Sequence, residues 1–212
     1  MAKELPIGFT MDMVKAILDG RKTVTRRVIK FPLNLPHLQG NPVKLLGDWA
    51  LSSIDKFEDG ILYYHCQTDV DSSSPGKVKS RYQPSDLLWL KETFNDYCDP
   101  YYKNPVYRVT DENYPGAKWK SSRFMPKKYA RTWLEVISVR PERLQDISLE
   151  DCYAEGIESQ FSANYKNTEN IPVMPLKGRF KRLWDSINAK RGYPWESNPW
   201  VWRIEFKEAT NG

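Results

Sequence analysis

The stretch Gly20-Arg21-Lys22-Thr23-Val24-Thr25-Arg26-Arg27 marks the place where the sequence changes from a helical to an extended pattern. Before it, Thr10 can cap a helix whose apolar residues fall on one face, and Gly20 stands where a left-handed C-terminal residue belongs. After it, β-branched residues continue to Ile29 and favour a strand. The sequence therefore predicts a helix followed at once by a strand.

This corner concentrates four cations, Arg21, Lys22, Arg26 and Arg27, with no acid among them. The local positive potential favours an anionic partner, above all phosphate. Neighbouring positive charges also lower the pKa of a lysine in their midst.

The composition is that of one basic domain. The chain has 212 residues, a formal net charge of +5, 12 Tyr and 8 Trp. Cations can hold phosphates while aromatic rings stack on bases, so this mixture suits a nucleic-acid partner. The alternative is a soluble protein with a lysine-rich surface.

A metal centre is not expected. Cys66, Cys98 and Cys152 are too far apart for a zinc knuckle, and His37 and His65 are the only histidines. We expect no metal and no cofactor.

The N-terminal residues lack the apolar run of a signal peptide, and no stretch approaches membrane-spanning length. These features predict a cytoplasmic protein with reduced thiols and no membrane partner.

The first half of the chain contains one clear hairpin signal. Residues 31–47 are proline-rich and predict an extended loop, whereas residues 49–57 and 61–67 are apolar runs that flank Glu58-Asp59-Gly60. The polar residues 68–81 predict a mobile loop. The continuous apolar run 87–90 predicts a strand covered on both sides.

The second half contains the main helix signals. Ser148-Leu149-Glu150-Asp151 is a capping-box pattern that opens a short helix, on which Leu149, Cys152 and Tyr153 can pack. Apolar residues at spacings of three and four predict an amphipathic helix over residues 176–188. Residues 106–109, 132–139 and 198–206 predict strands, the last with alternating faces.

A second basic segment covers residues 118–131 without a carboxylate. Its cations include Lys120, Arg123, Lys127, Lys128 and Arg131, interleaved with aromatic residues. Such a mixture is typical of a nucleic-acid groove, and its alternative is a solvated loop that leads into the next strand.

Glu155 is the last residue before Gly156, a helix-ending position. A carboxylate is unfavourable at a helix C-terminus, so either a group nearby compensates it or it is an exposed surface residue. Several separated strands with few helices predict a mostly β, α+β fold, a β-barrel with one or two helices at its mouth.

Four motifs in order resemble the ASCH domain family, a PUA-like β-barrel group. They are the Gly20 to Arg27 stretch, Asp86-Leu87-Leu88-Trp89-Leu90-Lys91-Glu92, Arg143-Leu144-Gln145-Asp146-Ile147 with Ala154-Glu155-Gly156-Ile157, and the terminal Asn198-Pro199-Trp200-Val201-Trp202-Arg203-Ile204-Glu205-Phe206. Arg123-Phe124-Met125-Pro126 is similar to longer phage and prophage members. The resemblance implies a single domain over residues 1–212 with an insertion at about 31–82.

The resemblance also implies a function on RNA or modified nucleosides. Members similar to this chain include small N4-acetylcytidine amidohydrolases, whose lysine, threonine and glutamate fall on Lys22, Thr25 and Glu155. In that chemistry a neutral lysine takes the threonine proton, and the glutamate protonates the departing amine or positions the lysine. Residues three apart on an ideal strand face opposite ways, so we expect a turn or bulge at Lys22-Thr23.

Three functions remain open at this stage. The first is a nucleoside- or nucleic-acid-directed hydrolase, best specified as N4-acetylcytidine amide hydrolysis. The second is metal-independent cleavage of single-stranded RNA, which the resemblance implies because some ASCH relatives are described as ribonucleases, and a cluster of Lys and Arg with a hydroxyl can stabilise the transition state without metal. The chain is also about twice the size such a small amidohydrolase needs and its additional segments are basic and aromatic, which favours a longer RNA or DNA strand over a free nucleoside. The third is a non-catalytic RNA-binding module. The residues expected to contact nucleic acid are Arg21, Arg26, Arg27, Lys120, Arg123, Lys127, Lys128 and Arg131.

Overall fold

The computed structural model describes residues 2–31, 51–67, 73–96, 105–157 and 175–209. The strands are β1 (Glu4–Gly8), β2 (Val24–Val28), β3 (Leu51–Glu58), β4 (Ile61–Gln67), β5 (Ser73–Lys79), β6 (Leu87–Lys91), β7 (Phe94–Asn95), β8 (Val106–Tyr107), β9 (Trp133–Arg143) and β10 (Trp200–Glu208). The α-helices are α1 (Met11–Leu18), α2 (Leu149–Ala154) and α3 (Leu176–Asn188). Short 3₁₀ turns include η3 (Ser122–Phe124) and η4 (Lys127–Tyr129). The protein is thus α+β, with strands predominating, as the sequence predicts.

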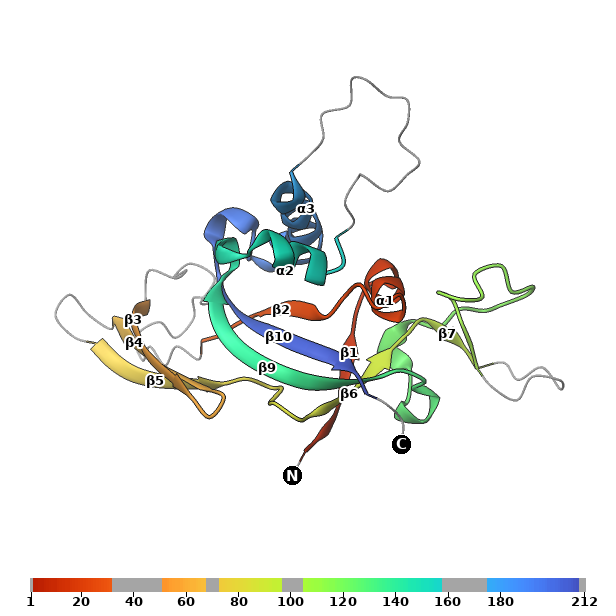
Figure 1. Ribbon diagram of the computed structural model, residues 1–212, viewed down its shortest axis with the longest axis horizontal. Helices are drawn as coiled ribbons and strands as arrows, with labels where there is room; N and C mark the ends of the chain where they lie inside the picture. The colour runs from red at the N-terminus through yellow and green to blue at the C-terminus, as the bar shows by residue number, and fades with distance from the viewer. Residues whose placement is uncertain (1, 32–50, 68–72, 97–104, 158–174, 210–212) are drawn as a thin grey trace, which may run out of the picture.

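A five-stranded sheet forms the centre of the molecule, in the order β1-β6-β9-β10-β2. The pair of β1 with β6 is parallel and the other pairs are antiparallel. The long strands β9 and β10 curve together through the middle of Figure 1. One face of this sheet contributes Trp202, Ile204 and Phe206 to the main apolar core, which confirms the alternation expected for the last strand.

The strand pairing described leaves this sheet open between β1 and β2, its two edge strands. A side chain spans the gap: Arg27 on β2 donates a hydrogen bond from Nη2 to the Gly8 carbonyl at the end of β1, over 2.8 Å. Helix α1 connects the two edges along the chain, and Val14 and Ile17 of this helix join the main core.

The helices α2 and α3 cover the other face of the sheet, above β2 and β10 in Figure 1. Phe180 and Trp184 of α3 pack with Cys152 of α2 in a second apolar cluster. The bounds of α3 are those predicted from its periodicity.

The packing expected for Leu149 and Tyr153 on α2 is wrong, since both side chains are exposed. A six-residue helix turns only one narrow face to the sheet, and on α2 that face carries Cys152.

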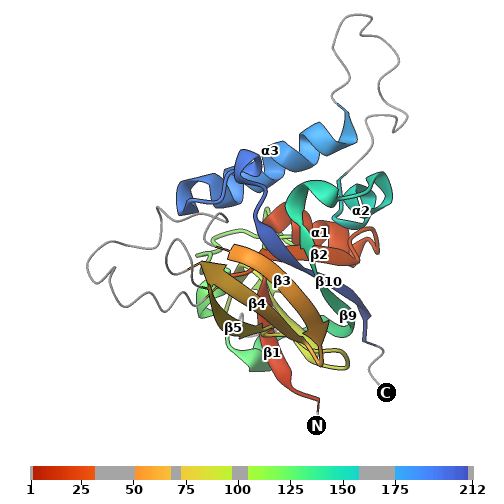
Figure 2. The same cartoon turned by 90° about the vertical axis from the view of Figure 1, so that its left-hand side faces the viewer.

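A second sheet, β3-β4-β5, lies beside the first and is the described part of the predicted insertion (Figure 2). Asp59 and Gly60 have φ angles of 52° and 71°, as expected for the hairpin turn. The loop predicted over residues 68–81 is wrong where β5 forms, because its pairing with β4 overrides a low strand propensity. A Cβ on Gly76 would come within 2.4 Å of the Tyr64 ring, so the glycine lets this ring lie against β5. The loop predicted at 31–47 falls almost entirely outside the described residues.

Within the ranges given above, no helix combines the length and apolar character needed to cross a membrane.

Candidate functional site

The chain changes its backbone partners within three residues at the corner after α1. Gly20 has a φ of 71°, which ends the helix. Lys22 then pairs with Glu155 in an isolated antiparallel bridge, and Thr23 donates its N–H to the Ala154 carbonyl over 2.8 Å. The ladder with β10 starts only at Val24. Lys22 therefore lies outside the regular strand, and the strand alternation that begins at Val24 does not extend back to it.

The Lys22 amine is enclosed and fully hydrogen bonded. It donates to the Glu155 carboxylate over 2.5 Å, to the Val24 carbonyl over 2.8 Å and to the Glu155 carbonyl over 2.9 Å. The Lys22 side chain has 0% exposure and that of Glu155 has 3%. An ammonium has three protons to donate, so all of them have acceptors in this arrangement.

Burial lowers the pKa of Lys22, and the positive charges of Arg27 and Arg26 act in the same direction. The Glu155 carboxylate opposes this shift through its charge and its hydrogen bond. The net lowering leaves a lysine that gives up its proton more easily than an exposed one, which is the state that a general base requires.

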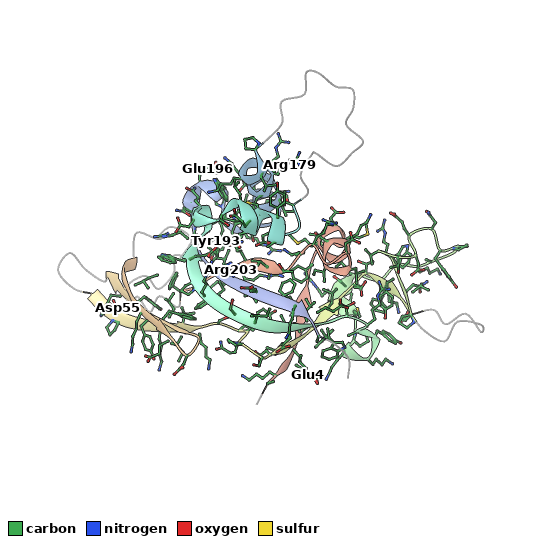
Figure 3. All side chains as sticks on the ribbon, viewed as in Figure 1. Glu4, Asp55, Arg179, Tyr193, Glu196 and Arg203 are labelled. Atoms are coloured by element: carbon green, nitrogen blue, oxygen red, sulfur yellow. The ribbon has the colours of Figure 1, made fainter. Side chains whose placement is uncertain are left out.

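Glu155 belongs to a larger network between α2 and the sheet. Arg26 donates to Glu155 over 3.2 Å, to Glu142 over 2.7 Å and to Asp151. Arg203 binds both oxygens of Asp151, over 2.9 and 2.8 Å. Figure 3 labels Arg203, whose side chain lies where β10 faces α2. The Glu155 carboxylate, unfavourably placed at a helix C-terminus, is thus compensated by two cations, which decides between the two readings of this residue.

Asp151 and Glu155 are four residues apart and both face the sheet, as the i, i+4 spacing on one helix requires. Hydrogen bonds from Arg203 lower the pKa of Asp151 to about 2, with Arg26 acting in the same direction. The sequence analysis missed Asp151 and Arg203 as partners. Two signals were available: the spacing of Asp151 from Glu155, and the position of Arg203 on the same face of its strand as the apolar Val201, which packs in the second cluster.

Thr25 is buried, but it lies on a different side of β2 from the network. Its backbone pairs with Ile204, and strand alternation turns its side chain away from that of Arg26, toward the side of Arg27. The hydrogen bonds described for the Lys22 amine go to Val24 and Glu155, and none goes to Thr25. The fold thus brings Lys22 and Glu155 into contact and leaves Thr25 close along the chain but unconnected to them.

Phe9 links this region to a hollow. The Lys22 amine and the Arg27 guanidinium lie 5.5 and 5.1 Å from the Phe9 ring centre. The same residue lines a small hollow of about 20 Å³, open to solvent, which we call the Phe9 hollow. Its lining residues are Phe9, Met11, Val14, Glu92, Thr93 and Val109.

The cations expected to contact nucleic acid differ in exposure. The Arg26 side chain is 1% exposed and is held by three carboxylates. Arg131 is held by Glu92 through two hydrogen bonds of 3.0 and 2.7 Å. Arg27 is half-buried. Arg21, Lys120 and Lys127 are ion-paired with Asp19, Asp96 and Glu4.

Arg123 and Lys128 are exposed on the η3 and η4 turns. Phe124, which lies between them in the sequence, is 73% exposed. Lys128 also lies over the Tyr129 ring, 4.9 Å from its centre. Cations and a protruding aromatic ring are therefore presented together on this segment.

The described residues hold no group of three or more His, Cys, Asp or Glu side chains that could bind a metal ion.

Comparisons with known proteins find no relative of this chain. No family model matches the chain, and no curated protein and no solved structure matches it.

Proposed function

We propose that this protein is an ASCH-type hydrolase with a PUA-like fold, acting on an N4-acylated cytidine as a free nucleoside or in RNA. The observation that carries the proposal is the 2.5 Å contact between the Lys22 amine and the Glu155 carboxylate, two groups 133 residues apart in the sequence. Both fall at positions where the resemblance to the amidohydrolases places functional groups.

The proposed reaction begins with a proton moving from Lys22 to Glu155. The reaction then requires the Lys22 side chain to move to the Thr25 hydroxyl, which faces the other side of β2, where the neutral amine accepts the hydroxyl proton. The Thr25 oxygen attacks the amide carbonyl carbon, and the C–N bond breaks as Glu155 gives its proton to the departing cytosine nitrogen. Water then hydrolyses the acyl ester on Thr25, which yields cytidine and a carboxylic acid in total.

The test is chromatographic detection of cytidine and acetate from N4-acetylcytidine. Thr25→Val, which keeps the shape of the side chain but removes the nucleophile, is expected to lower turnover at least about a hundredfold, whereas Thr25→Ser retains part of it. Circular dichroism of both variants checks the fold. Turnover by Thr25→Val equal to that of the wild type would exclude this mechanism, and the absence of wild-type turnover on both the nucleoside and acetylated RNA would exclude the function.

The exposed group formed by Arg123, Phe124 and Lys128 favours a second candidate, a non-catalytic RNA-binding module. Its two cations can contact phosphates, and its ring can stack on a base whatever the sequence. Cleavage of RNA receives no comparable support.

A further inference from the structure

Arg26 and Arg27 are neighbours on β2 but lie in different electrostatic surroundings. The Arg26 side chain is 1% exposed, and three carboxylates hold it. Arg27 faces the other side of the strand and is half-buried. In the described part of the chain it forms no ion pair, and the one hydrogen bond described for its guanidinium goes from Nη2 to the Gly8 carbonyl. A guanidinium has five N–H donors, so most of those of Arg27 are left for another acceptor.

No contacting anion neutralises the charge of Arg27. Burial lowers the pKa of Arg27, against the opposing interactions with Tyr82 and Glu155, and the positive charge of Arg191 adds to the lowering. The oxygens of Glu155 are engaged by two other cations. Burying a charge without a partner is unfavourable for a fold, and groups in such surroundings are candidates for a functional role.

Arg27 shares a face of β2 with Thr25, the proposed nucleophile. The two residues pair with Trp202 and Ile204 of β10, and residues two apart on a strand face the same way at a spacing of about 7 Å. The long side chain of Arg27 can therefore reach a group bonded to the Thr25 oxygen. The Arg27 guanidinium and the Lys22 amine, the proposed base, also lie 5.1 and 5.5 Å from the centre of one aromatic ring, that of Phe9.

We propose that Arg27 is a further catalytic residue, whose guanidinium stabilises the oxyanion formed when Thr25 attacks the acyl group. This inference rests on the proposed function and adds a group to its reaction. As the Thr25 oxygen bonds to the carbonyl carbon, the π electron pair of the carbonyl moves to its oxygen, which becomes an anion. When the pair returns, the C–N bond breaks and the nitrogen takes the proton from Glu155. A cation already in place for this charge lowers the barrier.

Steady-state kinetics with N4-acetylcytidine test this role. The oxyanion is absent from the bound substrate, so loss of its partner acts on kcat rather than on KM. We expect Arg27→Met to lower kcat at least about a hundredfold with KM almost unchanged, and Arg27→Lys, which keeps the charge, to retain part of the rate. Arg140→Met makes the same change at an exposed arginine of β9 and should leave both constants unchanged. A raised KM with an unchanged kcat would overturn the proposal, because Arg27 would then bind the substrate and not the oxyanion.

Unfolding experiments separate this role from a structural one without any substrate. Arg27→Met leaves no described carboxylate without its ion-pair partner, so its urea midpoint should equal or exceed that of the wild type. Arg26→Met takes a cation from three carboxylates and should lower the midpoint. Equal losses in the two variants would show that Arg27 also holds the fold together, and would overturn the proposal.

Turnover separates the failure of this inference from the failure of the proposed function. If the wild type hydrolyses neither N4-acetylcytidine nor acetylated RNA, or if Thr25→Val is as active as the wild type, the hydrolase mechanism fails and Arg27 has no oxyanion to stabilise. If turnover depends on Thr25 while Arg27→Met keeps the wild-type kcat, the hydrolase stands and the role of Arg27 alone is refuted.

Discussion

Arg26 and Arg203 lie directly opposite each other on β2 and β10, and both bind the carboxylate of Asp151. Arg140 on β9 faces Arg203 on the other side, so three arginines form a row across three strands. Like charges opposite each other destabilise a sheet. The acids of α2 and its neighbours make this row tolerable, and they attach the helix to the sheet at the place where Lys22 meets Glu155.

Loss of the Asp151 charge should loosen this attachment. We expect Asp151→Asn to lower the free energy of unfolding by about 3 kcal/mol, because two buried guanidinium groups lose their shared carboxylate. This is the lower end for a broken buried pair, since the Asp151 side chain is 14% exposed. Urea unfolding followed by circular dichroism measures the change. Glu150→Gln removes an exposed carboxylate from the same helix and serves as the control; equal effects of the two variants would contradict the shared role of Asp151.

Acid should weaken the same contact. The pKa of Asp151 is lowered from 3.8 to about 2 by the hydrogen bonds of Arg203, and then by those of Arg26. A carboxylate with a lowered pKa stabilises the fold above its unfolded pKa, and this stability is lost as the pH falls through the folded one. Between about pH 4 and pH 2 the wild type should lose about 1–2 kcal/mol more than Asp151→Asn, allowing for solvent screening. Parallel losses in the two proteins would show that Asp151 is not responsible.

The Lys22 and Glu155 charges should prove strongly coupled. Lys22→Met leaves a buried carboxylate with Arg26 as its remaining cation, and we expect a loss of about 3 kcal/mol in unfolding free energy. Lys22→Met combined with Glu155→Leu should cost less than the sum of the two single changes by about 1–3 kcal/mol. The four unfolding free energies of this double-mutant cycle provide the measurement, and additive effects would argue against a direct pair.

Gly156 should be difficult to replace, for a reason specific to its surroundings. It has a φ of 87°, and an added Cβ would come within 2.8 Å of the Ala16 side chain and 3.2 Å of the Lys22 Cβ. Gly116 has a φ of 72° with open space around it, so Gly116→Ala tests the backbone strain alone. Gly116→Ala is expected to cost about 1 kcal/mol and Gly156→Ala about 1–3 kcal/mol more. Equal unfolding midpoints would mean that the corner accommodates the methyl group.

If the protein binds RNA, the η3 and η4 turns should supply a measurable part of the affinity. Neutralising Arg123 and Lys128 together is expected to weaken binding to a single-stranded RNA and to reduce the slope of log affinity against log salt by about 1.4. Fluorescence anisotropy across a salt series measures both quantities. Neutralising Lys56 and Lys207 removes the same charge elsewhere on the surface. An equal change from this control pair would show that only net charge matters.

Local patterns in the sequence were sufficient for several elements. The three- and four-residue spacing of apolar side chains predicted α3 with its observed bounds, and the alternation along β10 predicted which residues enter the core. Asp59-Gly60 predicted the hairpin, and Gly20 the end of α1. These signals are local because the period of a helix or strand and the left-handed preference of glycine involve only neighbouring residues.

What lies together in space was decided by the tertiary structure. No local pattern in the sequence favours the pairing of β5 with β4 despite Pro75 and Gly76, or the burial of Arg26 among acids rather than its exposure to a nucleic acid. The site could be anticipated only in part: resemblance indicated Lys22, Thr25 and Glu155, of which the fold brings only Lys22 and Glu155 into contact, and it did not indicate the network that holds them. Contacts between segments more than a hundred residues apart depend on how the helices dock on the sheet, and no short-range periodicity encodes that docking.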